Sequence, residues 1–118
     1  MKITDPEMGE KLARALKAGN DLYSLSDIHD ALVHGSMQGH VIGDTWVLTR
    51  VHDWPKRRSV DIMFVVGHLE EALQSEGDLV KWSKGLGASL MTATGRDGWW
   101  EHRTPGWKKS GVLYTKDI

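Results

Sequence analysis

The apolar spacing of this sequence changes from helical to strand-like near Met37, and this change constrains the fold more than any other feature. Before Met37, apolar residues recur every three or four positions, and helix-capping residues stand at Asp5 and Ser24. After it, residues 40–66 alternate with period two and are interrupted by short turns. Residues 1–36 therefore predict a pair of helices, and the segment after them predicts an antiparallel meander.

A helix and further strands are expected after the meander. We predict a strand over Ser59–Val66, a helix over His68–Gly85 with a break near Gly77, and a strand over Ala88–Thr94. A closing strand is predicted over Gly111–Lys116. A strand–helix–strand unit of this kind forms a right-handed crossover between parallel strands.

The predicted fold class is therefore α/β, or more strictly α+β. It has a mixed sheet, made of an antiparallel meander and one β-α-β crossover, with helices on both faces. No linker-like composition divides the chain, so residues 1–118 are expected to form one domain, with the helical pair at 1–36 and the sheet at 37–118. Both faces of Ser59–Val66 are apolar, as in a covered central strand. We expect one face to carry Val60, Ile62, Phe64 and Val66, and the other to carry Asp61, Met63 and Val65.

Composition narrows the possible functions. The chain has no cysteine and a formal charge of −1, which excludes disulfides and thiolate metal sites and disfavours nucleic-acid binding. The six histidines form no i,i+4 pair, so no metal site is predicted. No membrane-length apolar run or signal-peptide core is present, which predicts a soluble intracellular domain. The basic turn Lys56-Arg57-Arg58 is either solvated or a contact for nucleic acid or an acidic partner.

The predicted order of elements resembles the GNAT acetyltransferase fold. In that comparison Ser59–Val66 corresponds to strand four, His68–Gly85 to the pyrophosphate-binding helix and Ala88–Thr94 to strand five. The resemblance implies acetyl-CoA as cofactor and N-acyl transfer as activity. It also implies that the pyrophosphate would lie at the start of the helix, where unpaired amides favour an anion.

Sequence motifs point to a narrower resemblance. The stretch Gly95-Arg96-Asp97-Gly98-Trp99, with Gly106-Trp107 and Gly111–Lys116, is similar to a group of short tailed-bacteriophage proteins predicted to be GNAT-like. The positions of Trp46, Thr49 and Pro55 also match that group. This resemblance implies a phage protein located in the host cytoplasm or in the virion, with other phage proteins among its partners.

The cofactor residues implied by the resemblance are Val66, Gly67, His68, Arg96 and Trp99. The GNAT signature Gln/Arg-x-x-Gly-x-Gly/Ala is replaced here by Gly67-His68-Leu69-Glu70-Glu71. The two glutamates add negative charge where a diphosphate would bind. Arg96 lies at the carboxyl end of a predicted strand, where it would either clamp an anion or form a turn with Asp97.

Catalytic and partner-binding residues have competing interpretations. Asp61 on strand four and Tyr114 on the closing strand are the candidate acid–base residues, although Asp61 could face solvent and Tyr114 could pack in the core. The chain is rich in tryptophan, with six residues of this type. Trp100 and Trp107 are candidate partner contacts, and core packing is the alternative role for both.

Two functions remain open. The first is an interaction or virion-associated protein that keeps the GNAT scaffold but has a degenerate acyl-CoA loop, as Glu70 and Glu71 suggest. The alternative is an acetyl-CoA-dependent N-acyltransferase with a divergent cofactor loop, which the β-α-β unit and Gly67 favour. A homo-oligomer is also conceivable, because the closing strand would leave a sheet edge that a second copy could pair with.

Overall fold

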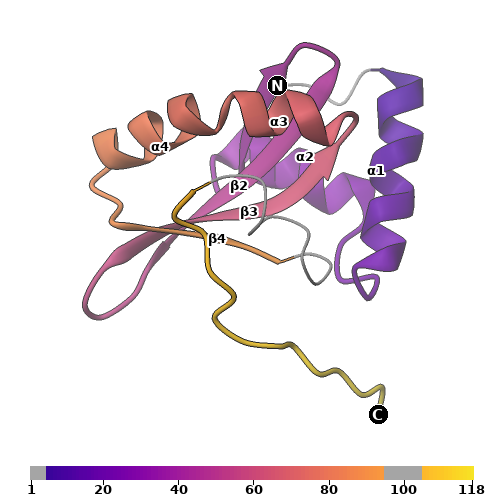
Figure 1. Cartoon of the computed structure of the whole chain (residues 1–118). Coiled ribbons are helices and arrows are strands. Elements are labelled where there is room, and N and C mark those ends of the chain that lie inside the picture. Colours follow the sequence, from indigo (N-terminus) through magenta and orange to yellow (C-terminus); the bar gives the residue numbers. More distant parts are fainter. Residues whose placement is uncertain (1–4, 95–104) are drawn as a thin grey trace.

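The computed structural model describes residues 5–94 and 105–118, and Figure 1 shows how the elements are arranged. In chain order they are α1 (Pro6–Ala18), α2 (Leu25–His34), β1 (Gln38–Ile42), β2 (Thr45–Asp53), β3 (Arg58–Val66), α3 (Leu69–Gln74), α4 (Glu76–Gly85) and β4 (Leu90–Ala93). The change from helices to strands falls close to Met37, as the sequence predicts.

Both N-terminal helices begin at the predicted caps. The Asp5 carboxylate accepts from the backbone N–H of Glu7 at 3.0 Å, and Pro6 occupies the first position of α1. At the start of α2, Ser24 and Asp27 form a reciprocal capping box, with bonds of 2.9 and 3.1 Å between side chain and backbone. The predicted helical pair is thus confirmed.

The four strands form one mixed sheet in the order β1-β2-β3-β4. β1 pairs with β2, and β2 with β3, in antiparallel orientation, whereas β3 and β4 are parallel. The chain crosses from β3 to β4 through α3 and α4, because parallel neighbours need a crossover connection. This confirms the meander, the crossover and the α+β class.

Two apolar clusters cover the two faces of the sheet. On one face, α1 and α2 pack against the sheet through Met8, Leu12, Leu16, Ile28, Met37, Trp46, Leu48 and Val66. On the other face, α3 and α4 pack around Val47, Ile62, Ala72 and Leu79. Figure 1 shows α1 and the α3–α4 pair on different sides of the strands. Helices on both faces agree with the prediction.

The alternation of β3 differs from the prediction because the strand contains a β-bulge. Leu48 pairs with Phe64, but its neighbour Thr49 pairs with Ile62, so Met63 is the extra residue. Ile62 therefore packs under α3 and α4, whereas Phe64 and Val66 pack on the α1 side. The prediction that these residues share a face was wrong. By alternation from Ile62, the Asp61 side chain lies on the face that also carries Phe64.

Two predictions about the second half of the chain need correction. The helix after β3 breaks at Ser75, not at Gly77, and Gly77 lies inside α4. The segment Gly111–Lys116 forms no strand, and Tyr114 is 88% exposed. Residues of high strand propensity form a strand only when a neighbouring strand supplies hydrogen bonds, and within the described residues this segment has no such neighbour.

Candidate binding site

A buried carboxylate, Asp61, links three strands of the sheet. Only 5% of Asp61 is exposed. Its Oδ2 accepts from Arg50 on β2, at 3.2 Å from Nε and 3.0 Å from Nη2. Its Oδ1 accepts from the hydroxyls of Ser59 on β3 at 2.8 Å and Thr92 on β4 at 2.7 Å. Both oxygens are therefore saturated by donors, as a buried charge requires.

These donors determine the ionisation of Asp61. Burial raises the pKa of its carboxyl, but the hydrogen bonds from Thr92, Ser59 and Arg50, together with the charge of Arg50, outweigh burial and hold the pKa below its ordinary value. Asp61 is thus ionised at neutral pH with both oxygens engaged. A general base needs a free oxygen and a pKa near the working pH, so the arrangement suits a positioning role better than proton transfer.

The Asp61 network continues to an exposed aromatic ring. Trp54, in the turn after β2, donates its Nε1–H to the Ser59 hydroxyl at 2.9 Å. The ring of His52 lies 4.2 Å from the Trp54 ring, centroid to centroid. Trp54 remains 50% exposed. Its indole is thus held by a hydrogen bond and a ring contact while much of its apolar surface stays open.

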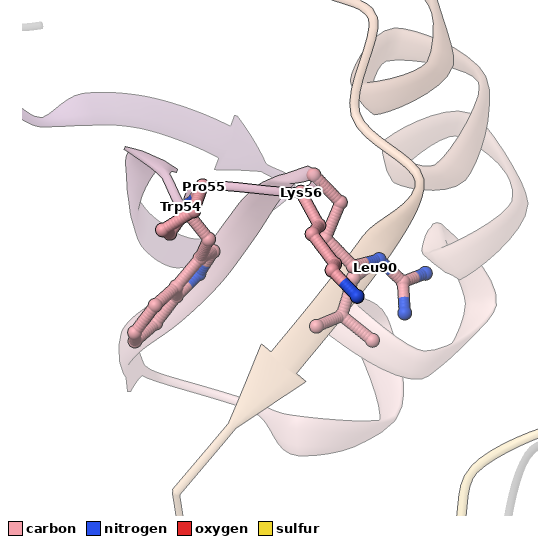
Figure 2. Close-up of a pocket in the computed structure, with 5 residues that line it drawn as sticks. Trp54, Pro55, Lys56 and Leu90 are labelled. Atoms are coloured by element: carbon pink, nitrogen blue, oxygen red, sulfur yellow. The ribbon is translucent and has the colours of Figure 1, made fainter.

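Trp54 forms one side of a surface hollow of about 440 Å³. The hollow is lined by Trp54, Pro55, Lys56, Arg57 and Leu90. Figure 2 shows Trp54 and Pro55 on one side of it, and Lys56 with Leu90 on the other. Leu90 begins β4 and is 37% exposed. The walls of the hollow are therefore apolar, and two cationic side chains, Lys56 and Arg57, contribute to them mainly through their aliphatic stems.

The Asp61 carboxylate holds both sides of this hollow. It reaches Trp54 through the Ser59 hydroxyl, which accepts from the indole. It reaches the β4 side through Thr92, which stands two residues after Leu90 and so projects from the same face of the strand. One buried carboxylate thus fixes the spacing between the Trp54 wall and the Leu90 wall.

The basic turn is anchored by its arginines. Arg57 donates from Nε to the Ser89 hydroxyl at 3.0 Å and from Nη2 to the Ser89 carbonyl. Arg58 donates to the Asp53 carboxylate at 2.6 Å and to the Leu86 carbonyl at 2.6 Å. Both arginines therefore tie the turn to its own strand or to the segment before β4.

Lys56 differs from its two arginine neighbours in its hydrogen bonds. Arg57 and Arg58 donate to Ser89, Asp53 and Leu86, whereas Lys56 lines the hollow and makes no hydrogen bond or ion pair with the described part of the chain. A lysine ammonium is a compact charge on a flexible stem, so it can move to meet a carboxylate that enters the hollow. Of the three basic residues of this turn, Lys56 is therefore the one whose side chain is not held by the described part of the chain.

The turn between β3 and α3, where the resemblance places a cofactor, is filled by the protein's own groups. The N–H of His68 donates to the Thr45 hydroxyl at 2.8 Å. The Glu71 carboxylate lies on the β1–β2 turn, with Oε1 3.0 Å from the Thr45 hydroxyl and Oε2 accepting from the Asp44 N–H at 3.3 Å. Glu71 thus brings a negative charge to the start of α3 and holds α3 to the β1–β2 turn.

Two glycines make this close packing possible. A Cβ on Gly43 would lie 1.7 Å from Glu71 Oε2. Gly67, at φ +120°, lies so close to β2 that a Cβ would come within 2.7 Å of the Asp44 carbonyl. Only glycine combines that backbone angle with the missing side chain. In this structure Gly67 therefore allows the end of β3 to lie close to the start of β2.

The remaining predicted site residues are spread over the molecule. Val66 is buried in the core under α1, and Tyr114 is exposed at the C-terminal end. Trp107 packs against the α3–α4 cluster, and its Nε1 lies 3.4 Å from Glu76 Oε1. Arg96, Trp99 and Trp100 lie outside the described residues. Within the described chain, the structure keeps Gly67 and His68 together and places Asp61 elsewhere, with Arg50.

The hollow at Trp54 was not predicted from the sequence. A local signal was present, because an aromatic residue followed by proline and a basic turn is an exposed hairpin end. Its second wall, Leu90, comes from a distant part of the sequence and reaches the hollow through the parallel pairing of β3 with β4.

Compared with protein-family models, with curated proteins and with solved structures, the chain shows no match. Among residues 5–94 and 105–118, no three His, Asp or Glu side chains gather in a way that would hold a metal ion. Over the same ranges, no helix has the length and apolar character needed to cross a membrane. The proposals below therefore rest on the geometry of the chain itself.

Proposed function

We propose that this chain is a binding protein that docks an extended segment of a protein partner in the hollow between Trp54 and Leu90. The observation that carries the proposal is the state of Trp54, which is half exposed yet held through its Nε1 by Ser59 and the buried Asp61. An aromatic side chain fixed in place loses little conformational entropy on binding, and such residues contribute strongly to interfaces.

The lining of the hollow defines the chemistry of the partner. Trp54, Pro55 and Leu90 offer apolar surface, and Lys56 offers a positive charge beside it. A segment that carries an aliphatic side chain next to an aspartate or glutamate would match both features. The resemblance to the phage group would place such a segment in another phage protein, in the infected cell or in the virion.

The contacts at the start of α3 favour a binding function over acyl transfer. A coenzyme A diphosphate at this position would have to displace Glu71 from Thr45 and Asp44, and it would then face the displaced carboxylate. Like charges at such a distance repel. The N-acyltransferase alternative is favoured by one observation, the parallel β3–β4 pair joined by helices, and a fold alone does not define an activity.

We expect a short acidic–apolar probe peptide to bind at Trp54. The probe is a blocked pentapeptide of alternating aspartate and isoleucine, titrated into ¹⁵N-labelled protein while the tryptophan indole N–H resonances are followed. The Trp54 resonance should shift saturably, because the indole forms a wall of the hollow. In isothermal titration calorimetry with the same probe, Trp54→Ala should bind at least about tenfold more weakly than wild type, the loss typical of a central aromatic contact.

Two controls accompany this titration. Leu22→Ala removes a leucine that is 71% exposed and absent from the lining of the hollow, and it should bind the probe like wild type. A lysine–isoleucine probe should bind at least about tenfold more weakly, because its charges repel Lys56. Equal binding by wild type and Trp54→Ala would overturn the proposed site.

A further inference from the structure

The C-terminal residues 111–118 carry several apolar side chains that are exposed to solvent. Val112, Leu113, Tyr114 and Ile118 are each at least 60% exposed. Figure 1 shows this segment leaving the sheet and ending away from the helices. Its consecutive residues Val112, Leu113, Tyr114 and Thr115 are of types that are enriched in strands. A segment of strand-forming residues with unburied apolar groups is suited to pairing with a sheet edge.

The sheet offers such an edge at β4. Within the described residues β4 pairs with β3 alone, so its second side has unpaired backbone groups. The hollow lies at the N-terminal end of the same strand, because Leu90 both begins β4 and lines the hollow. A strand added along β4 would therefore run directly into the hollow.

We propose that residues 111–118 of one copy bind a second copy of this chain, as a strand antiparallel to β4 whose end enters the Trp54 hollow. The inference rests on the proposed function, since it names the occupant of that site. In the antiparallel orientation Asp117 and Ile118 reach the Leu90 end of β4. There the Asp117 carboxylate meets Lys56, and Ile118 extends the contact toward the apolar walls.

The charge of Asp117 favours the antiparallel orientation of the added strand over the parallel one. A parallel strand would carry Asp117 to the far end of β4, away from Lys56. The same exchange can occur in both directions, so that each copy gives its C-terminal segment and receives the other's. Two exposed segments and two hollows are then covered in a closed dimer.

The test exchanges the charges between two variants of the full chain. Sedimentation velocity should show a concentration-dependent dimer for wild type. Lys56→Glu and Asp117→Lys, each alone, should raise the dimer dissociation constant at least about tenfold, because each creates like charges in both hollows. An equimolar mixture of the two variants should dimerise again, because one of its interfaces is wild type and the other has the two charges exchanged.

Several outcomes would overturn this inference. A wild-type chain that stays monomeric at all concentrations would show that no second copy binds. If neither substitution changes the dimer dissociation constant, or if the mixture of the two variants does not dimerise, the contact between copies lies elsewhere. Leu22→Asp should dimerise like wild type. If wild type is monomeric and the probe peptide still shifts Trp54, the inference fails while the proposed function stands; if the probe fails as well, both fail.

Discussion

Replacing Gly67 with alanine should lower the free energy of unfolding by about 3 kcal/mol or more. The new Cβ would lie 2.7 Å from the Asp44 carbonyl, 2.9 Å from the Thr45 hydroxyl and 3.0 Å from the Thr45 Cα. Two of these three neighbours are backbone atoms, which cannot move without shifting β2. The φ of +120° adds strain for any side chain. Urea denaturation followed by circular dichroism measures the effect.

Gly77→Ala is the matched control for this substitution. Gly77 lies in α4, and a Cβ there would meet no atom within 4 Å. Alanine should therefore stabilise the chain by about 0.5–1 kcal/mol, the difference in helix propensity. If Gly67→Ala unfolds at the same urea concentration as wild type, the tight contact between Gly67 and β2 does not exist, and Gly67 would be free to contact a ligand.

The second large effect is expected for Asp61→Asn, which should lower the free energy of unfolding by about 2–3 kcal/mol. The amide has nearly the same shape, but it is neutral, and only one of its two terminal atoms accepts hydrogen bonds. If its oxygen faces Arg50, the hydroxyls of Ser59 and Thr92 lose the acceptor that Asp61 Oδ1 supplies. Arg50 also loses the carboxylate with which it forms an ion pair. Because Ser59 holds Trp54, the variant should also bind the probe peptide more weakly.

The pH dependence of the free energy of unfolding separates the contribution of the Asp61 charge from the contribution of the side chain's shape. The pKa of Asp61 is lower in the folded chain than its ordinary value of 3.8, so the folded state favours the ionised form. Its contribution is complete above the unfolded pKa and is lost as the pH falls through the folded pKa. The stability difference between wild type and Asp61→Asn should shrink below about pH 4. A difference that stays constant down to pH 2 would contradict this role.

Local signals in the sequence were sufficient for most of the fold. The caps at Asp5 and Ser24 define helix starts because a cap and its amide partners are only two or three residues apart. The closing strand was predicted from the same kind of local pattern, yet a strand needs a neighbour that spacing cannot identify. The bulge at Met63 was missed because β3 is apolar on both faces, so an extra residue leaves no change in polarity.

The candidate site was less predictable. Asp61 was selected from the sequence as the lone carboxylate of its strand, but its partners Arg50 and Thr92 come from β2 and β4 and depend on register. Glu71 was expected to disfavour a diphosphate through its charge. Its position on the β1–β2 turn adds a reason that the sequence does not contain, since Thr45 and Glu71 meet only after the sheet and α3 pack together.

Acetyl-CoA is the ligand that separates a binding protein from a transferase most directly. We predict that millimolar acetyl-CoA leaves the melting temperature and the His68 amide resonance unchanged, because Thr45 and Glu71 already occupy that turn. A ligand at a hundred times its dissociation constant would add about 2.7 kcal/mol and raise the melting temperature by several degrees. A saturable rise of this size, with a shift of the His68 amide and none at the Trp54 indole, would contradict the proposed binding function.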